Sequence, residues 1–77
     1  MQTVTIYGKG FIVRVYDDGG RTGIQTSGGT KGRVDKAVGY LLKHRPSPQA
    51  AVNLLRSELA GMVERIDGSF NKQDTEE

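Results

Sequence analysis

The stretch Phe11-Ile12-Val13-Arg14-Val15-Tyr16 has the clearest strand pattern in this 77-residue sequence. Side chains alternate between the two faces of a strand, so Phe11, Val13 and Val15 share one apolar face. The β-branched and aromatic residues of the stretch also suit a pleated surface. We therefore expect a strand here, with its apolar face covered by the rest of the chain.

Two further strands are predicted on either side of this stretch. Residues 3–7 alternate in the same way and reach it through Gly8-Lys9-Gly10, a connection of hairpin length. Asp17-Asp18-Gly19-Gly20 is a strong turn signal, because Asp tolerates and Gly favours a positive φ. Residues 22–26 then form a weaker third strand, and the three strands together predict an antiparallel meander.

The second half of the chain has helical spacing. Val34, Val38 and Leu41 predict a first helix that begins near residues 30–33 and ends before Pro46. Ser47-Pro48 is typical of the start of a second helix. An apolar stripe spaced by three and four residues extends this second helix as far as Ile66, before the stop signal Asp67-Gly68. The stripe consists of Val52, Leu55, Leu59, Met62 and Ile66, with Val63 alongside.

The expected fold class is therefore α+β, in the order β-β-β-α-α, with both helices packed on one face of the sheet. Residues 1–68 are expected to form a single small domain. Residues 69–77 are expected to form a flexible polar tail, from which Phe70 folds back on the helix end. The predicted core is Val4, Ile6, Phe11, Val13, Val15, Ile24, Val34, Val38, Leu41, Leu42, Val52, Leu55, Leu59, Met62, Val63 and Ile66.

Charge is unevenly distributed along the chain, although the net charge is only +2. Residues 1–45 hold eight Lys and Arg against three Asp, whereas residues 46–77 hold three Lys and Arg against six acidic residues. This asymmetry favours an anionic partner for the first half. No apolar run approaches the roughly 18 residues of a membrane span, and the first residues do not resemble a signal peptide. We expect a cytoplasmic protein.

The sequence offers little for catalysis. It contains no cysteine and a single histidine, His44, beside a proline turn, where contact with helix-end carbonyls is expected. Asp17 and Asp18 are explained by their turn. Neither a nucleophile–base set nor metal-ligand spacing is recognisable, so we expect no enzyme, no metal and no cofactor. Lys31 and Arg33, beside the glycines of residues 28–32, could hold an anion at a helix start.

The outer face of the predicted sheet is more informative. Tyr7, Ile12, Arg14 and Tyr16 share this face, and no element is expected to cover it. Aromatic rings stack on bases and arginine pairs with phosphate or guanine, but the same residue types also anchor protein interfaces. A third interpretation is that they simply coat an exposed sheet.

Residues 10–22 resemble the first hairpin of the arm-type DNA-binding domain of phage tyrosine integrases. The resemblance covers about residues 10–44. It implies a three-stranded sheet, backed by one helix, that enters the major groove of DNA. This chain departs from that pattern through its extra strand before the hairpin and its second long helix.

The leading hypothesis is a non-enzymatic module that binds nucleic acid, DNA or RNA, through a basic surface formed by the sheet and the first helix. The alternative is a small regulatory or inhibitory protein, of the phage or mobile-element accessory type, that binds a host protein through the same face. A homodimer through the stripe of the second helix is a further option. The candidate binding residues are Lys9, Ile12, Arg14, Tyr16, Arg21, Lys31 and Arg33.

Overall fold

A computed structural model describes residues 2–19, 21–28 and 32–70. It has one sheet and two helices, in agreement with the expected α+β class. The elements are β1 (Gln2–Gly8), β2 (Phe11–Asp18), β3 (Arg21–Gly28), α1 (Arg33–His44), α2 (Pro48–Glu58) and β4 (Val63–Asp67). Within the described residues, neither helix is both long enough and apolar enough to cross a membrane.

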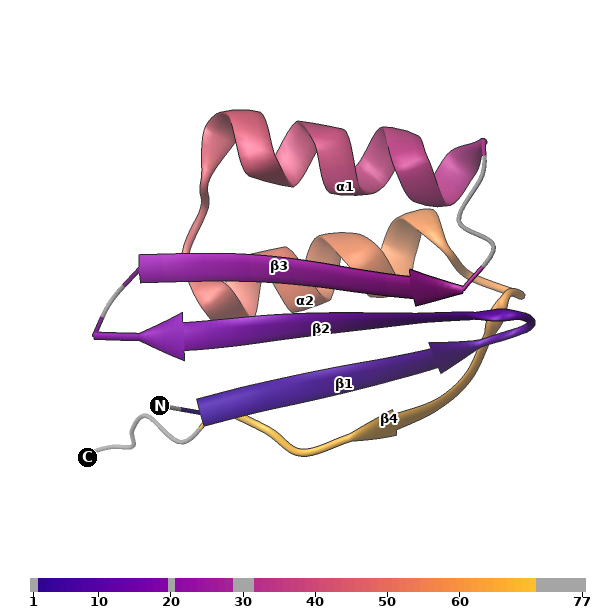
Figure 1. The fold of residues 1–77 in the computed structure, drawn as a ribbon, viewed down its shortest axis with the longest axis horizontal. Coiled ribbons are helices and arrows are strands. Elements are labelled where there is room, and N and C mark those ends of the chain that lie inside the picture. The colour runs from indigo at the N-terminus through magenta and orange to yellow at the C-terminus, as the bar shows by residue number, and fades with distance from the viewer. Residues whose placement is uncertain (1, 20, 29–31, 71–77) are drawn as a thin grey trace.

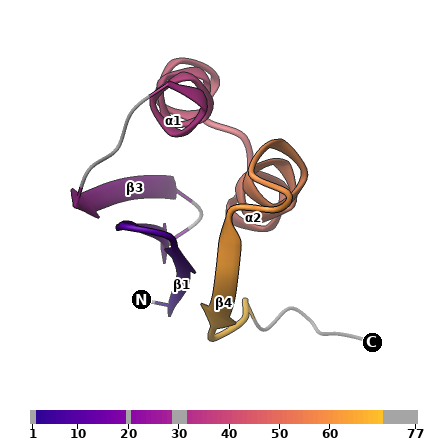
Figure 2. The same cartoon turned by 90° about the vertical axis from the view of Figure 1, so that its right-hand side faces the viewer.

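The sheet is antiparallel, with the strand order β3-β2-β1-β4 (Figure 1). The first three strands form the expected meander. Both helices lie on one side of the sheet, as Figure 2 shows, and the described residues place no helix on the other side. The fold therefore has two layers and one open sheet face.

The ends of the two helices follow local sequence signals. Ser47 caps α2, because its Oγ accepts a hydrogen bond from the backbone N–H of Ala50 at 3.3 Å, and Pro48 occupies the first turn. Helix α1 ends at His44, and Arg45 then adopts the left-handed conformation, with φ of 50°. The guanidinium of Arg45 donates to the carbonyl oxygen of Thr22 at 2.8 Å, which ties the end of α1 to β3.

The predicted extent of the second helix is wrong. Helix α2 ends at Glu58, and residues Val63–Asp67 form a fourth strand that pairs with β1. Gly61, with φ of 87°, lies in the turn between them, where a helix could not continue. The register sets Ile66 opposite Ile6, so this end of the supposed helical stripe packs as a strand.

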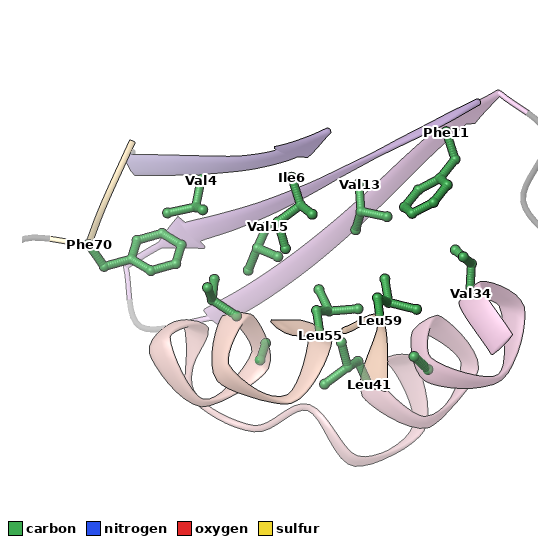
Figure 3. Close-up of a cluster of buried hydrophobic side chains, with 13 residues drawn as sticks. Val4, Ile6, Phe11, Val13, Val15, Val34, Leu41, Leu55, Leu59 and Phe70 are labelled. Atoms are coloured by element: carbon green, nitrogen blue, oxygen red, sulfur yellow. The ribbon is translucent and has the colours of Figure 1, made fainter. Parts of the chain in front are cut away.

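The core lies between the sheet and the helices (Figure 3). Three valines and Ile6 on the inner face of β1 and β2 meet Leu41 of α1 and Leu55 of α2, and all are fully buried. Five predicted core residues are only half-buried against this cluster: Ile24, Val38, Met62, Val63 and Ile66. Leu42 is a wrong prediction, because 44% of it is exposed to solvent.

The core also includes three residues outside the predicted list. Ala37 of α1 and Ala51 of α2 are buried, and Phe70 is only 7% exposed. Figure 3 shows the Phe70 ring beside Val4, at the end of the cluster. Packing therefore continues two residues past Gly68. Residues 71–77, the rest of the expected tail, lie outside the described residues.

Leu55→Ala should lower the free energy of unfolding by about 2–5 kcal/mol, because it removes a fully buried side chain from the centre of the core. Denaturant unfolding measures the change. Ser57→Ala, at an exposed position of the same helix, is the control and should change little. Equal midpoints for Leu55→Ala and the wild type would contradict the packing of α2 on the sheet.

Gly8→Ala should destabilise the fold by about 1–3 kcal/mol, because overpacking forces a buried ring to move. A Cβ at Gly8 would lie 2.0 Å from Cζ of Phe11. Gly39→Ala is the opposite case. Gly39 lies in the interior of α1, and outside its own stretch of helix no atom lies within 4 Å of the new Cβ. It should stabilise the protein by roughly 0.5–1 kcal/mol, so thermal melting should separate the two variants in opposite directions.

Phe70→Ala should lower the melting temperature, since truncating a buried phenylalanine costs about 3 kcal/mol or more. A chain truncated after Phe70 should melt like the wild type, because the residues removed are mostly acidic or polar. If the truncated chain were the less stable of the two, the contribution assigned to Phe70 would be wrong.

Candidate binding surface

The uncovered side of the sheet, called the open face below, is built from alternate residues of all four strands. The strand registers align these residues in rows, of which one contains Arg65, Tyr7, Ile12 and Ser27 and the next Asp67, Thr5, Arg14 and Gln25. A third row contains Thr3, Tyr16 and Gly23. The open face thus mixes aromatic, aliphatic, hydroxyl and basic groups, as expected for the residues predicted to lie there.

Arg14 occupies the middle of the open face. It lies on β2 between Thr5 of β1 and Gln25 of β3, and it is half-buried by its neighbours. Among the described residues, Arg14 takes part in no salt bridge. Its guanidinium is therefore a charge held in place by packing and available to an incoming acceptor.

Tyr16 lies on β2 two residues beyond Arg14, on the same face. Its hydroxyl donates a hydrogen bond to Oε1 of Gln25, which fixes the direction of the ring. The β3 residue opposite Tyr16 is Gly23, which has no side chain to cover the ring. Tyr16 and Arg14 therefore present an aromatic surface and a cation side by side.

A second aromatic–cation pair lies at the β1–β4 side. Arg65 Cζ lies 4.4 Å from the centroid of the Tyr7 ring, a cation–π distance, and Arg65 also donates to Asp67 at 2.9 Å. Sequence reasoning missed Arg65 and Asp67, because residues 63–66 were assigned to a helix and Asp67 to its stop signal. Gly61, followed by the β-branched Val63 and Ile66, was the signal that could have identified a strand.

The open face is hollowed near the β1–β2 turn. A depression of about 310 Å³ is lined there by Tyr7, Ile12, Ser27 and Glu64, together with Phe11 and the glycines Gly8, Gly10 and Gly28. A larger hollow, of about 440 Å³, lies on the opposite layer between α1 and α2 and is lined in part by Tyr40 and Leu54.

The structure separates the predicted site residues. Ile12, Arg14 and Tyr16 lie together on the open face. Lys9, in the β1–β2 turn, and Arg21, opposite Asp18 at the β2–β3 turn, lie at the two ends of the sheet. Arg33 begins α1, in the helical layer, and is not part of the open face. Lys31 lies outside the described residues, as does most of the glycine-rich segment.

The apolar stripe of the second helix does not form a surface for a second copy. Val52, Leu55 and Leu59 are buried in the protein's own core, and Met62 and Ile66 lie outside α2. A homodimer through this stripe would need side chains that are already buried inside each molecule.

The described residues contain no group of three His, Asp or Glu side chains placed to hold a metal ion. The ring of His44 lies 4.2 Å from that of Tyr40, one helical turn earlier in α1, so it has an aromatic contact on the outside of the helix.

The chain matches no protein family model, no curated protein and no solved structure. The resemblance of residues 10–22 to integrase arm-type domains therefore carries no argument about function, and the surface has to be interpreted from its own residues.

Proposed function

We propose that the protein is a binding module that holds single-stranded nucleic acid, RNA or DNA, on the open face. The observation that carries this proposal is Arg14, which has no salt-bridge partner among the described residues and lies beside the Tyr16 ring, on a sheet face that neither α1 nor α2 covers. The arginine can bind the phosphate of a nucleotide, and the aromatic ring beside it can stack on the base.

The accessibility of base faces favours a single strand. A duplex keeps the faces of its bases inside the stack, so aromatic side chains on a sheet can stack only on unpaired bases. Tyr16 lies opposite Gly23, and Ile12 lines the hollow with Tyr7, so two places along β2 are suited to flat groups. The phosphate that joins two bases bound at these two places would lie near Arg14.

The distribution of basic residues supports a path for the bound nucleic-acid strand along β2. Lys9 precedes β2, Arg14 lies near its middle, and Arg21 is opposite its last residue. At about 3.3 Å per residue, the path from Lys9 to Asp18 is at most roughly 30 Å, the length of a few extended nucleotides. Three basic groups would then follow one nucleic-acid backbone.

The same spacing is the observation that favours the alternative, a regulator or inhibitor that binds a host protein. Lys9 and Arg21 lie at opposite ends of the sheet, and Arg65 is already paired with Asp67, so the described residues form no dense basic cluster on the open face. Tyrosine and arginine are common anchors of protein interfaces.

Titration with single-stranded RNA, single-stranded DNA and duplex DNA at two salt concentrations tests the proposal. Single strands should bind more tightly than the duplex. The log–log salt slope should be about −2, since three phosphate contacts contribute about −0.7 each on a single strand. Tyr16→Ala should weaken binding by about 1–3 kcal/mol and leave the slope unchanged, because stacking releases no counterions.

A matched pair of charge variants locates the surface. Arg14→Gln should weaken binding and make the slope about 0.7 less steep. Lys43→Gln removes the same charge from the exposed side of α1 and should leave the slope unchanged. Equal losses for the two variants, or no binding of any nucleic acid at low salt, would refute the proposal. Pull-down with wild type and Tyr16→Ala would then test the host-protein alternative.

A further inference from the structure

The two edges of the sheet differ in how they are protected from pairing with another strand. Strand β4 is short, is joined to β1 across a register shift, and carries the charged residues Glu64, Arg65 and Asp67. These are features by which proteins prevent edge-to-edge association. Strand β3 is eight residues long and pairs with β2 without a register shift, and its residues 22–28 include no charge and no proline.

The outward backbone groups of β3 can be identified from one contact. In an antiparallel pair, alternate residues direct their N–H and C=O groups away from the partner strand. The carbonyl of Thr22 accepts from Arg45, so Thr22 is an outward residue, and Ile24 and Thr26 share its parity. Among the described residues, none bonds to the outward backbone groups of Ile24 or Thr26.

An apolar flank of α1 lies over this edge. Helix α1 contacts β3 and lies beside it in Figure 1. Val38 and Leu42 are four residues apart and so share one flank of the helix. Arg45 continues this flank and reaches Thr22 of β3, whereas Tyr40 on the opposite flank lines the hollow toward α2. Leu42 is 44% exposed here and Ile24 is half-buried, so a strand added to β3 would bury further apolar surface.

We infer that the edge of β3 pairs with the β3 edge of a second copy of this chain, in an antiparallel twofold dimer. In that pairing, Ile24 of each copy lies opposite Thr26 of the other, and the axis passes beside Gln25. The outward N–H and C=O groups of Ile24 and Thr26 in each copy are then hydrogen-bonded to the other copy. Each copy also brings its Ile24 toward the Leu42 flank of the other, so both exposed leucines are covered by one contact.

The lack of charged side chains in residues 22–28 favours pairing with a second copy over pairing with a foreign strand. Residues 22–28 carry none, so self-pairing sets no like charges opposite each other. The charged side chain at this edge, Arg45, is already bonded to the carbonyl of Thr22 and lies outside the pairing of Ile24 with Thr26. The dimer would join two four-stranded sheets into one continuous sheet, with both open faces on the same side, and it does not depend on what the open face binds.

The absence of cysteine from the chain makes cross-linking a clean test. In the inferred pairing, the two Gln25 side chains face each other at a non-hydrogen-bonded position, where Cβ atoms lie about 4.5–5.5 Å apart. Gln25→Cys should therefore form a disulfide-linked dimer under mild oxidation. Ser27→Cys is the matched control on the same face of β3. Its two copies would lie about four residues apart along the strands, roughly 13 Å, and should not cross-link.

Sedimentation equilibrium from about 1 µM to about 1 mM measures the dimer without cross-links. Thr26→Pro removes an outward N–H that the fold does not use, and Leu42→Lys places a charge on the apolar flank. Each should weaken the dimer by roughly tenfold or more. Tyr40→Lys, at a similarly exposed residue on the opposite flank, should not weaken it.

Circular dichroism melts of each variant keep a loss of dimer distinct from a loss of fold. A wild-type chain that stays monomeric throughout this range would overturn the inference. Equal cross-linking of Gln25→Cys and Ser27→Cys, or a dimer disrupted only by Tyr40→Lys, would overturn it as well.

Discussion

The burial of one face of β2 is the constraint on which the rest of the structure depends. Phe11, Val13 and Val15 are almost completely buried, and β2 is one of the two central strands. A domain of this size buries only about 60% of its unfolded surface, so it cannot cover both faces of a sheet. Both helices pack on one face, and neither helix covers the other face.

The small size of the domain also explains the fourth strand. After α2 has contributed Val52 and Leu55 to the core, β1 still has one edge without a partner strand. Unpaired backbone groups beside an apolar core are costly, and pairing with residues 63–67 satisfies them. This strand also brings Arg65 onto the Tyr7 ring and so extends the open face beyond the meander. A packing requirement thus alters the composition of the candidate binding surface.

The open face and the β3 edge are distinct surfaces with different chemistry. The open face offers side chains, with Arg14 and Tyr16 at its centre, and is suited to a ligand with charged and flat groups. The β3 edge offers backbone groups and the apolar flank of α1, and is suited to another strand. Because they share only β3, both surfaces can be occupied in one molecule.

Local interactions explain what the sequence alone determined. Alternation defined β1 and β2, turn residues placed the hairpins, and Ser47-Pro48 placed the start of α2, because each signal acts over a few neighbouring residues. The central part of the site, Ile12, Arg14 and Tyr16, followed from the same alternation. Only the tertiary structure decided the fate of residues 59–67, the exposure of Leu42 and the separation of Lys9 from Arg21. A spacing of three and four residues suits a helix in isolation, but at Ile66 it was outweighed by hydrogen bonds to the open edge of β1, a strand about sixty residues earlier in the chain.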